Sequence, residues 1–194
     1  MTTCNFSTNT ALFALTILLF GMSSTTTAND LDLRVSDDAI HGNLTLENDE
    51  STLGYGLGYF YKDSNEAINI LNVDLHTKGQ TVISNMPTTV GIGIQGNYFK
   101  EDALKGSAIA IGGSVRVNLP DIPGTSIQTE AHYAPDVLAF GDSDTYTRAN
   151  VQMNYRIIRT ADISAGYRYL NASLKAGSHR TFESGFFVGI KMNF

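Results

Sequence analysis

The chain has 194 residues, the length of a single domain, and 42% of them are hydrophobic. Its formal net charge of −6, from 13 Lys and Arg against 19 Asp and Glu, argues against nucleic-acid binding, which needs clustered cations to neutralise phosphates. A lone cysteine, Cys4, excludes an internal disulfide, and the His residues lack metal-ligand spacing, so we expect neither a metal nor another cofactor.

An apolar segment near the N-terminus is the only candidate for a helical membrane segment. It runs from Ala11 to Met22, which is too short for the roughly 20 residues that a membrane-spanning helix needs. Small and hydroxylated residues follow as far as Ala28, as in a signal-peptide cleavage site. We therefore predict a secretory signal peptide at residues 1–28 and a mature domain at residues 29–194.

The mature chain contains ten segments in which bulky apolar residues alternate with small or polar ones, the pattern of strands with two different faces. The segments are residues 31–35, 39–47, 52–62, 67–77, 89–99, 107–119, 125–134, 147–158, 161–171 and 182–194. Most match the about 9–11 residues that a strand needs to cross a membrane, whereas strands of soluble proteins average about 5–6. We predict an all-β fold, a transmembrane antiparallel up-and-down β-barrel of ten strands, with a soluble β-sandwich as the weaker alternative. Eight strands is the alternative count if residues 31–47 form a plug or an irregular arm.

For three of these segments, the sequence predicts which side chains point into the barrel and which point outward. In residues 52–62, the Leu and Tyr side chains share one face and the glycines share the other, which places glycines inside the barrel. In residues 67–77, Ile68 and Ile70 have the parity of the polar face, so we expect a bulge there. In residues 182–194, the even positions from Phe182 to Phe194 form the outward apolar face.

The connections give an orientation. Residues 120–124 and 159–160 are short and suit the periplasmic side, whereas residues 135–146 and 171–180 are long and suit the extracellular side. Residues 78–87 depart from this rule, because they form a long connection that should be periplasmic. The loop at residues 135–146 could contact a partner or fold over the barrel mouth as a lid.

The polar faces of the predicted strands place charges in the lumen, where charges must pair because water is scarce. The expected lumen network consists of Asp74, Arg116, Glu130, His132, Arg156, Arg168 and Lys191, with His76 on the same face. We interpret this set first as interlocking ion pairs that plug the bore of a structural or interaction barrel. The alternative is a narrow porin-like channel whose cations, Arg116, Arg156, Arg168 and Lys191, favour small anionic solutes.

A third hypothesis is a lipid-modifying enzyme. His132 and Glu130 share a face, as a catalytic base and its orienting acid would. Ser126 is expected on the opposite face of that strand, so no nucleophile is assigned. We therefore predict that the protein is not an enzyme.

Three segments of the mature chain resemble the YfaZ family of bacterial outer-membrane proteins. They are residues 29–44 (NDLDLRVSDDAIHGNL), 130–140 (EAHYAPDVLAF) and 166–169 (GYRY). The resemblance implies a barrel in the bacterial outer membrane, in contact with outer-membrane lipid and lipopolysaccharide, and it implies no established activity. Separately, residues 189–194 resemble the C-terminal signal read by the barrel assembly machinery, with Gly189, Met192 and Phe194 as its matching residues. The sequence leaves the oligomeric state open.

Overall fold

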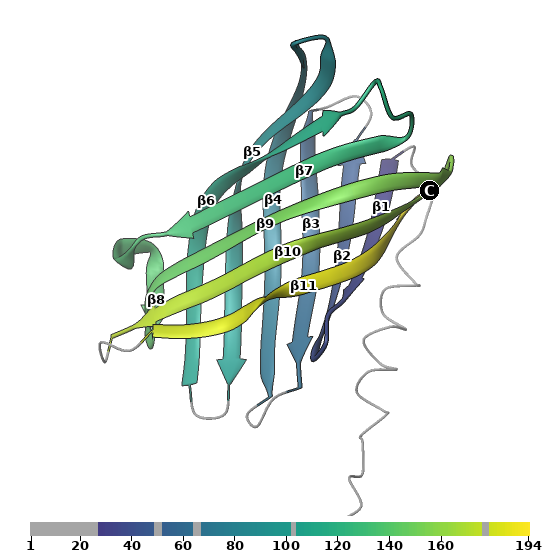
Figure 1. The fold of residues 1–194 in the computed structure, drawn as a ribbon. Coiled ribbons are helices and arrows are strands. Elements are labelled where there is room, and N and C mark those ends of the chain that lie inside the picture. The colour runs from purple at the N-terminus through teal and green to yellow at the C-terminus, as the bar shows by residue number, and fades with distance from the viewer. Residues whose placement is uncertain (1–26, 49–51, 64–66, 102–103, 176–178) are drawn as a thin grey trace, which may run out of the picture.

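The computed structural model describes residues 27–48, 52–63, 67–101, 104–175 and 179–194 (Figure 1). Most of the predicted signal peptide lies outside these residues, and the first strand begins at Thr27. The strands are β1 (Thr27–Val35), β2 (Ala39–Asn48), β3 (Leu53–Lys62), β4 (Ile68–Ile83), β5 (Met86–Glu101), β6 (Leu104–Asn118), β7 (Thr125–Ala134), β8 (Ala139–Gly141), β9 (Ser143–Ile158), β10 (Ala161–Leu174) and β11 (His179–Asn193). A short 3-10 helix, η1 (Asp136–Leu138), precedes β8. No helix of the described residues is long and apolar enough to cross a membrane.

The strands close into one antiparallel barrel. Neighbours along the chain pair with one another, β7 pairs with β9, and β1 pairs with β11 over residues 30–35 and 188–193. The short strand β8 lies outside this ring. It pairs with the beginning of β6, at Gly106 to Ala108. The ten-strand prediction is therefore confirmed. The eight-strand alternative is wrong, because β1 and β2 pair along their whole length and complete the ring.

The barrel has two ends that are used below as reference points. We call one the turn end: it carries the start of β1, the end of β11 and the β4–β5, β6–β7 and β9–β10 turns, in the upper part of Figure 1. The other, the loop end, carries the β1–β2, β3–β4, β5–β6, β7–β9 and β10–β11 connections.

Alternation along each strand separates an apolar exterior from a lumen, as β3 illustrates. Leu53, Tyr55, Leu57 and Tyr59 are 37–53% exposed, and the glycines between them are buried. The predicted placement of the β3 glycines inside the barrel is confirmed. Exposed large apolar side chains recur on every long strand of the barrel, which gives the molecule an apolar outer band that suits lipid rather than water.

The β4–β5 region corrects two expectations. The predicted long connection at residues 78–87 is wrong: these residues extend both strands into a hairpin whose turn is Ser84-Asn85, with φ of 49° and 64°. Positive φ at both central positions matches the strand twist of a two-residue hairpin. The bulge expected at Ile68 and Ile70 is also wrong, because the β3–β4 register is continuous and both side chains point into the lumen.

A bulge occurs instead in β11. The β10–β11 register shifts between Leu170, opposite Glu183, and Asn171, opposite Thr181. Phe182 is the extra residue, and its side chain is fully buried in the lumen. The expected outward direction of Phe182 is therefore wrong, because the bulge reverses the parity of the strand before Glu183.

The two predicted long loops are shorter than expected. Residues 135–146 include η1, β8 and the first residues of β9, and Ala139 of β8 is buried. The loop at residues 171–180 contributes its first part to β10 and its last part to β11. Cross-strand pairing between β10 and β11 continues as far as Ser173 opposite His179, so both strands extend into the predicted loop.

The lumen at the loop end is apolar. Twelve buried residues form one cluster there, with Leu104 packed against it: Ala39, Phe60, Ile68, Ile70, Phe99, Ala108, Ala110, Ala134, Tyr146, Leu170, Ala172 and Phe182. The remaining lumen, toward the turn end, is lined mainly by polar and charged side chains and carries the candidate site.

Candidate functional site

The middle of the lumen holds two arginines on either side of one aromatic ring. Arg34 of β1 donates to Asp32 from Nε at 3.0 Å and from an Nη at 2.5 Å, which is a two-point contact. Its guanidinium centre lies 5.2 Å from the centroid of Phe187, and that of Arg168 lies 5.0 Å from the same ring. Phe187 thus offers both guanidinium groups a cation–π contact.

Arg168 has partners on three other strands. Its Nη1 donates to Glu183 on β11 at 3.2 Å, and its Nη2 contacts Nδ1 of His41 on β2 at 3.3 Å. Its guanidinium also lies 5.9 Å from the ring of Phe60 on β3. The second oxygen of Glu183 accepts a hydrogen bond from Ser36 at 2.9 Å. Because Arg168 and Glu183 are 2% and 3% exposed, this ion pair links the neighbouring strands β10 and β11 in a nearly dry environment.

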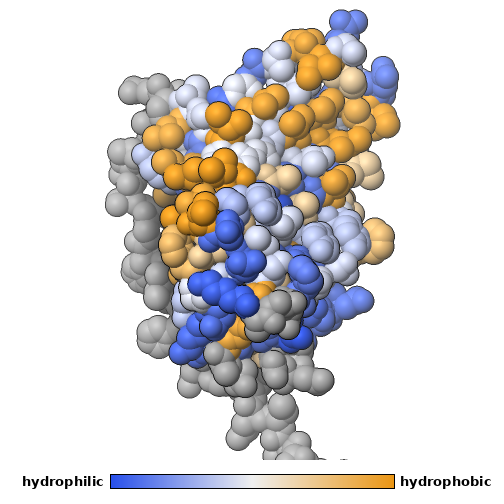
Figure 2. All heavy atoms as spheres, turned by 90° about the vertical axis from the view of Figure 1, so that its left-hand side faces the viewer, coloured by the Kyte–Doolittle hydropathy of each residue, from blue (hydrophilic) through white to orange (hydrophobic). Residues whose placement is uncertain are grey.

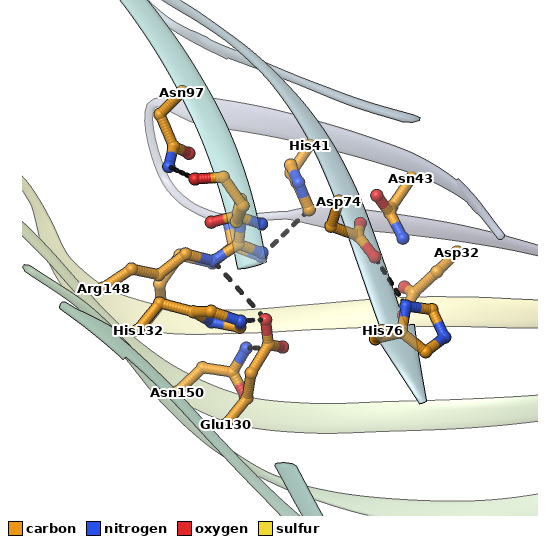
Figure 3. Close-up of polar contacts among 12 residues, drawn as sticks. Asp32, His41, Asn43, Asp74, His76, Asn97, Glu130, His132, Arg148 and Asn150 are labelled. Atoms are coloured by element: carbon orange, nitrogen blue, oxygen red, sulfur yellow. Dashed lines mark hydrogen bonds and ion pairs between the residues drawn. The ribbon is translucent and has the colours of Figure 1, made fainter. Parts of the chain in front are cut away.

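A third group surrounds Glu130 on β7 (Figure 3). Asn150 donates to its Oε2 at 3.0 Å, and Nδ1 of His132 lies 3.3 Å from its Oε1. The Nε of Arg148 is 4.0 Å from the same oxygen, an ion pair without a hydrogen bond. This carboxylate is therefore held by one amide and two basic side chains from β7 and β9.

A fourth group lies on β2 and β4 toward the turn end. Nδ1 of His76 is 2.6 Å from Asp74 (Figure 3). Nε2 of His76 is 3.5 Å from Glu47, and Lys78 contacts the same Glu47 oxygen. These side chains lie across the glycines of β3. A Cβ on Gly56 would be 1.9 Å from Oδ1 of Asp74, so only glycine leaves room for this layer.

The fifth group centres on Asp162 of β10. Arg116 of β6 donates to it at 3.1 Å and Arg156 of β9 at 3.3 Å. Arg116 also donates to the hydroxyl of Ser126 at 3.0 Å. The side chain of Asp162 is 3% exposed, whereas those of Arg116 and Arg156 are 25% and 54% exposed, so water reaches the cations from the turn end. A separate pair, Lys191 with Asp30 at 2.6 Å, lies nearby on β11 and β1.

The predicted lumen residues all point inward, but they fall into separate groups. Arg116 and Arg156 share one acid, Glu130 and His132 contact each other, and Asp74, Arg168 and Lys191 each belong to another group. Sequence reasoning did not include several of their partners: Asp30, Asp32, Arg34, His41, Glu47, Lys78, Arg148, Asp162 and Glu183. The alternation in β1, β9 and β10 already placed Asp32, Arg148 and Asp162 on polar faces, so their parity was a usable signal. Glu183 has the parity of Lys191 on the polar face of β11, so its parity was a usable signal as well.

A small cavity of about 10 Å³ separates the apolar cluster from the charged groups, with room for about one water molecule. Its lining residues are His41, Phe60, Ile70, Asn72, Tyr146, Arg148, Arg168 and Leu170. Nε of Arg168, Nε2 of His41 and Oδ1 of Asn72 are buried without a hydrogen-bond partner among the described residues. These atoms are the polar partners that one buried water would need.

The geometry corrects the expectation for Ser126. Its side chain is buried in the lumen on the same face as Glu130 and His132, not on the opposite face. It lies six residues from His132, roughly 20 Å along the strand, and its hydroxyl contacts Arg116 and Asn154 instead. Ser126 therefore cannot act as a nucleophile activated by His132. In the part of the chain that the structure describes, no cluster of three or more His, Cys, Asp or Glu side chains could hold a metal ion.

The C-terminal segment contributes to closure of the barrel. Gly189 faces the lumen, where a Cβ would lie 2.7 Å from the backbone oxygen of Leu33 and 2.9 Å from Cγ of Arg34. Met192 and Phe194 are 37% and 52% exposed on the outer surface at the turn end. The glycine therefore has a structural role beside Arg34 in addition to any role in recognition.

A family model described as "YfaZ precursor" matches residues 9–194. The chain is 32% identical over 160 residues to "Outer membrane protein YfaZ" of Escherichia coli (strain K12), which covers 80% of this chain and 74% of that protein.

Two solved structures illustrate the likeness to other barrels. A KdgM porin in complex with disordered oligogalacturonate is similar with a TM-score of 0.45 and 11% identity, over 86% of this chain and 99% of that one. A bacterial polysaccharide outer membrane secretin is similar with a TM-score of 0.46 and 13% identity, over 89% of this chain and 66% of that one. On the family match and the identity to the E. coli protein, this chain is a member of the YfaZ family, and it is an outer-membrane β-barrel protein.

Proposed function

We propose that this protein is a closed, non-conducting barrel with a structural or interaction role in the outer membrane. The observation that carries the proposal is the apolar packing across the loop end. Phe99 of β5 stacks on Tyr146 of β9 at a centroid distance of 6.3 Å and contacts Phe182 of β11 at 5.0 Å. These three strands are not neighbours in the barrel, so their aromatic rings meet across the bore.

Burial supports the same conclusion. Phe99 and Phe182 are 0% exposed and Tyr146 is 1% exposed, although they lie near one mouth of a barrel. An open channel would leave lumen side chains exposed to water along its length. The barrel is also narrow, and barrels of about this strand number are filled by their own side chains.

The charged groups favour a closed barrel over an anion channel. Each cation that the channel hypothesis requires has an acidic partner: Asp162 for Arg116 and Arg156, Glu183 for Arg168, and Asp30 for Lys191. Anion selectivity requires cationic charge that is not neutralised in this way. The pairing instead lowers the cost of burying charge between the strands.

Single-channel recording in a planar bilayer tests the proposal. We expect no steady current from the wild-type barrel, and we expect openings from the Phe99→Ala/Phe182→Ala variant, because it removes the two rings that meet across the bore. Phe186→Ala is the matched control, since Phe186 is 80% exposed on the exterior. A steady wild-type current whose selectivity changes in Arg116→Ala or Arg156→Ala would contradict the proposal and favour a narrow channel.

We also propose that the barrel assembly machinery recognises the end of β11. The exposure of Met192 and Phe194 at the turn end supports this, because a recognised segment must present side chains to a partner. Phe194→Ala should lower the amount of folded barrel in cells while refolding into detergent is unchanged. Equal amounts of folded wild-type and Phe194→Ala protein in cells would contradict it, and Phe186→Ala serves again as the control.

A further inference from the structure

Three polar side chains form a row on the outside of the barrel at the loop end. Asn69 of β4 lies opposite Lys100 of β5, and Lys100 lies opposite Lys105 of β6. The residues that flank the row in sequence, Phe99 and Glu101, are buried, so Lys100 points outward. Lys105 is exposed, and Gly106 beside it faces Phe99 in the lumen. The row therefore faces the membrane or its boundary.

Within the described parts of the chain, the ammonium groups of Lys100 and Lys105 have no acidic side chain as an ion-pair partner. Like charges directly opposite each other on neighbouring strands are destabilising, and neither ammonium group forms an ion pair with a described residue. Two nearby acids are engaged elsewhere: Glu101 binds Arg180, and Asp142 accepts the backbone N–H of Lys105 at 3.0 Å. The position thus carries two adjacent ammonium groups, neither of which is ion-paired among the described residues.

Asn69 adds a directed hydrogen-bond donor beside the lysines. The hydroxyl of Tyr59 donates to Oδ1 of Asn69 at 2.6 Å. This bond orients the amide and leaves its NH₂ group available. The three residues stand on adjacent strands roughly 5 Å apart, so two flexible lysine side chains and one amide can converge on a single phosphate group.

Apolar groups lie directly on the membrane side of this row. In the next rows toward the turn end, Leu71, Tyr98 and Phe140 are 45%, 48% and 47% exposed. Gly96, one row further, leaves a position without a side chain between Val73 and Ile109. Figure 2 shows hydrophobic residues over the upper and middle parts of one side of the barrel, and hydrophilic ones toward the lower, loop end. The row therefore lies where lipid headgroups meet acyl chains.

We propose that Asn69, Lys100 and Lys105 bind a phosphate of lipid A, the phosphorylated anchor of lipopolysaccharide, and that its acyl chains pack on Leu71, Tyr98 and Phe140. Lipid A is the occupant because the loop end faces the outer leaflet: barrels of this class place tight turns, such as Ser84-Asn85 and Arg159-Thr160 here, on the periplasmic side. The proposal does not depend on whether the lumen is closed.

Binding of purified lipid A to the full barrel in detergent, followed by native mass spectrometry, tests the site. We expect Lys100→Gln/Lys105→Gln to bind bisphosphorylated lipid A about tenfold more weakly than wild type, because two charge-assisted contacts are lost. Arg159→Gln is the control: it removes an exposed cation at the turn end and should bind as wild type does. A heat-modifiability gel shift verifies that each variant is folded.

Further ligands separate lipid A from other sources of phosphate. Dephosphorylated lipid A should bind the wild type and the double variant equally, and phosphatidylglycerol should bind more weakly than lipid A. Unchanged lipid A binding by the double variant would overturn the site. Inorganic phosphate that displaces lipid A at equal concentration would show a site for the free ion, and phosphatidylglycerol that binds as tightly would show a site for any anionic lipid. Either result would overturn the assignment to lipid A.

Discussion

The two halves of the lumen are filled in different ways inside one continuous wall. At the loop end, Phe60, Phe99, Tyr146 and Phe182 pack together with almost no access to water. Toward the turn end, the same strands present acids and bases that form ion pairs, and the outermost cations are partly solvated. On the exterior, exposed apolar side chains occur over parts of both halves, and hydrophilic residues gather toward the loop end (Figure 2).

The surroundings of the lumen side chains therefore change along the barrel, from dry and apolar at the loop end to charged and partly hydrated at the turn end. Buried aromatic packing stabilises through the area and shape of the contact and tolerates little loss of volume. Ion pairs near water contribute little on their own, since solvent screens them and replaces a lost partner. The middle layer, with Arg168 and Glu183, combines charge with deep burial, so it should respond to substitution more like the apolar half.

The largest effect is expected from Phe99→Ala at the centre of the apolar cluster. Removing this ring leaves a cavity next to Tyr146 and Phe182, and the free energy of unfolding should fall by about 4 kcal/mol. Urea titration of the barrel in lipid vesicles, followed by circular dichroism, measures it, because the chain has no Trp for fluorescence. A loss no greater than that of Phe186→Ala would show that the loop end is not closely packed.

Glu183→Gln should have the next largest effect. The substitution leaves Arg168, whose side chain is 2% exposed, without its charged partner, and it should cost about 3 kcal/mol of unfolding free energy. Replacing both members, with Arg168→Met and Glu183→Leu, should recover most of that loss, because no unpaired charge remains. Equal instability of the single and double variants would show that packing, and not charge, is what the pair supplies.

Asp162→Asn makes the same chemical change in the turn-end half. Its two partners are arginines that are 25% and 54% exposed, so water solvates them when the carboxylate is removed. We expect a loss of about 1 kcal/mol, measured by the same titration as Glu183→Gln. A loss as large as that of Glu183→Gln would remove the proposed distinction between the two regions.

The smallest effect is expected from Lys191→Gln. Lys191 and Asp30 are 20% and 18% exposed, and their ion pair stands apart from the other groups. The change should cost about 0.5 kcal/mol at low salt and less at high salt, where screening already weakens the wild-type pair. Urea titration at two salt concentrations measures both values. If the loss of unfolding free energy in Lys191→Gln does not change with salt, the loss does not come from the ion pair with Asp30.

The strands were predictable because their pattern is local. Tyr55, Gly56 and Leu57 show by alternation alone which face meets lipid. Arg116, Glu130 and Lys191 have the parity of the polar face, and in the structure each contacts an oppositely charged or basic partner from the polar faces of the strands. Ile68 and Ile70 were misread because apolar lumen positions break the rule that the inside is polar. The β4–β5 hairpin was missed because residues 78–87 do not alternate between polar and apolar, and because its turn, Ser84-Asn85, contains no glycine.

The sequence by itself determined the class of fold, the number of strands and the side of each strand that faces the membrane, because side-chain direction in a strand follows from position alone. Only the tertiary structure decided which charges meet, since partners such as Arg168 and His41 are 127 residues apart and come together through barrel closure. It also decided that Phe182 points inward, because the bulge that turns it depends on the register with β10. The apolar closure of the loop end, formed by rings from opposite walls, is likewise a property of the closed barrel and of no single strand.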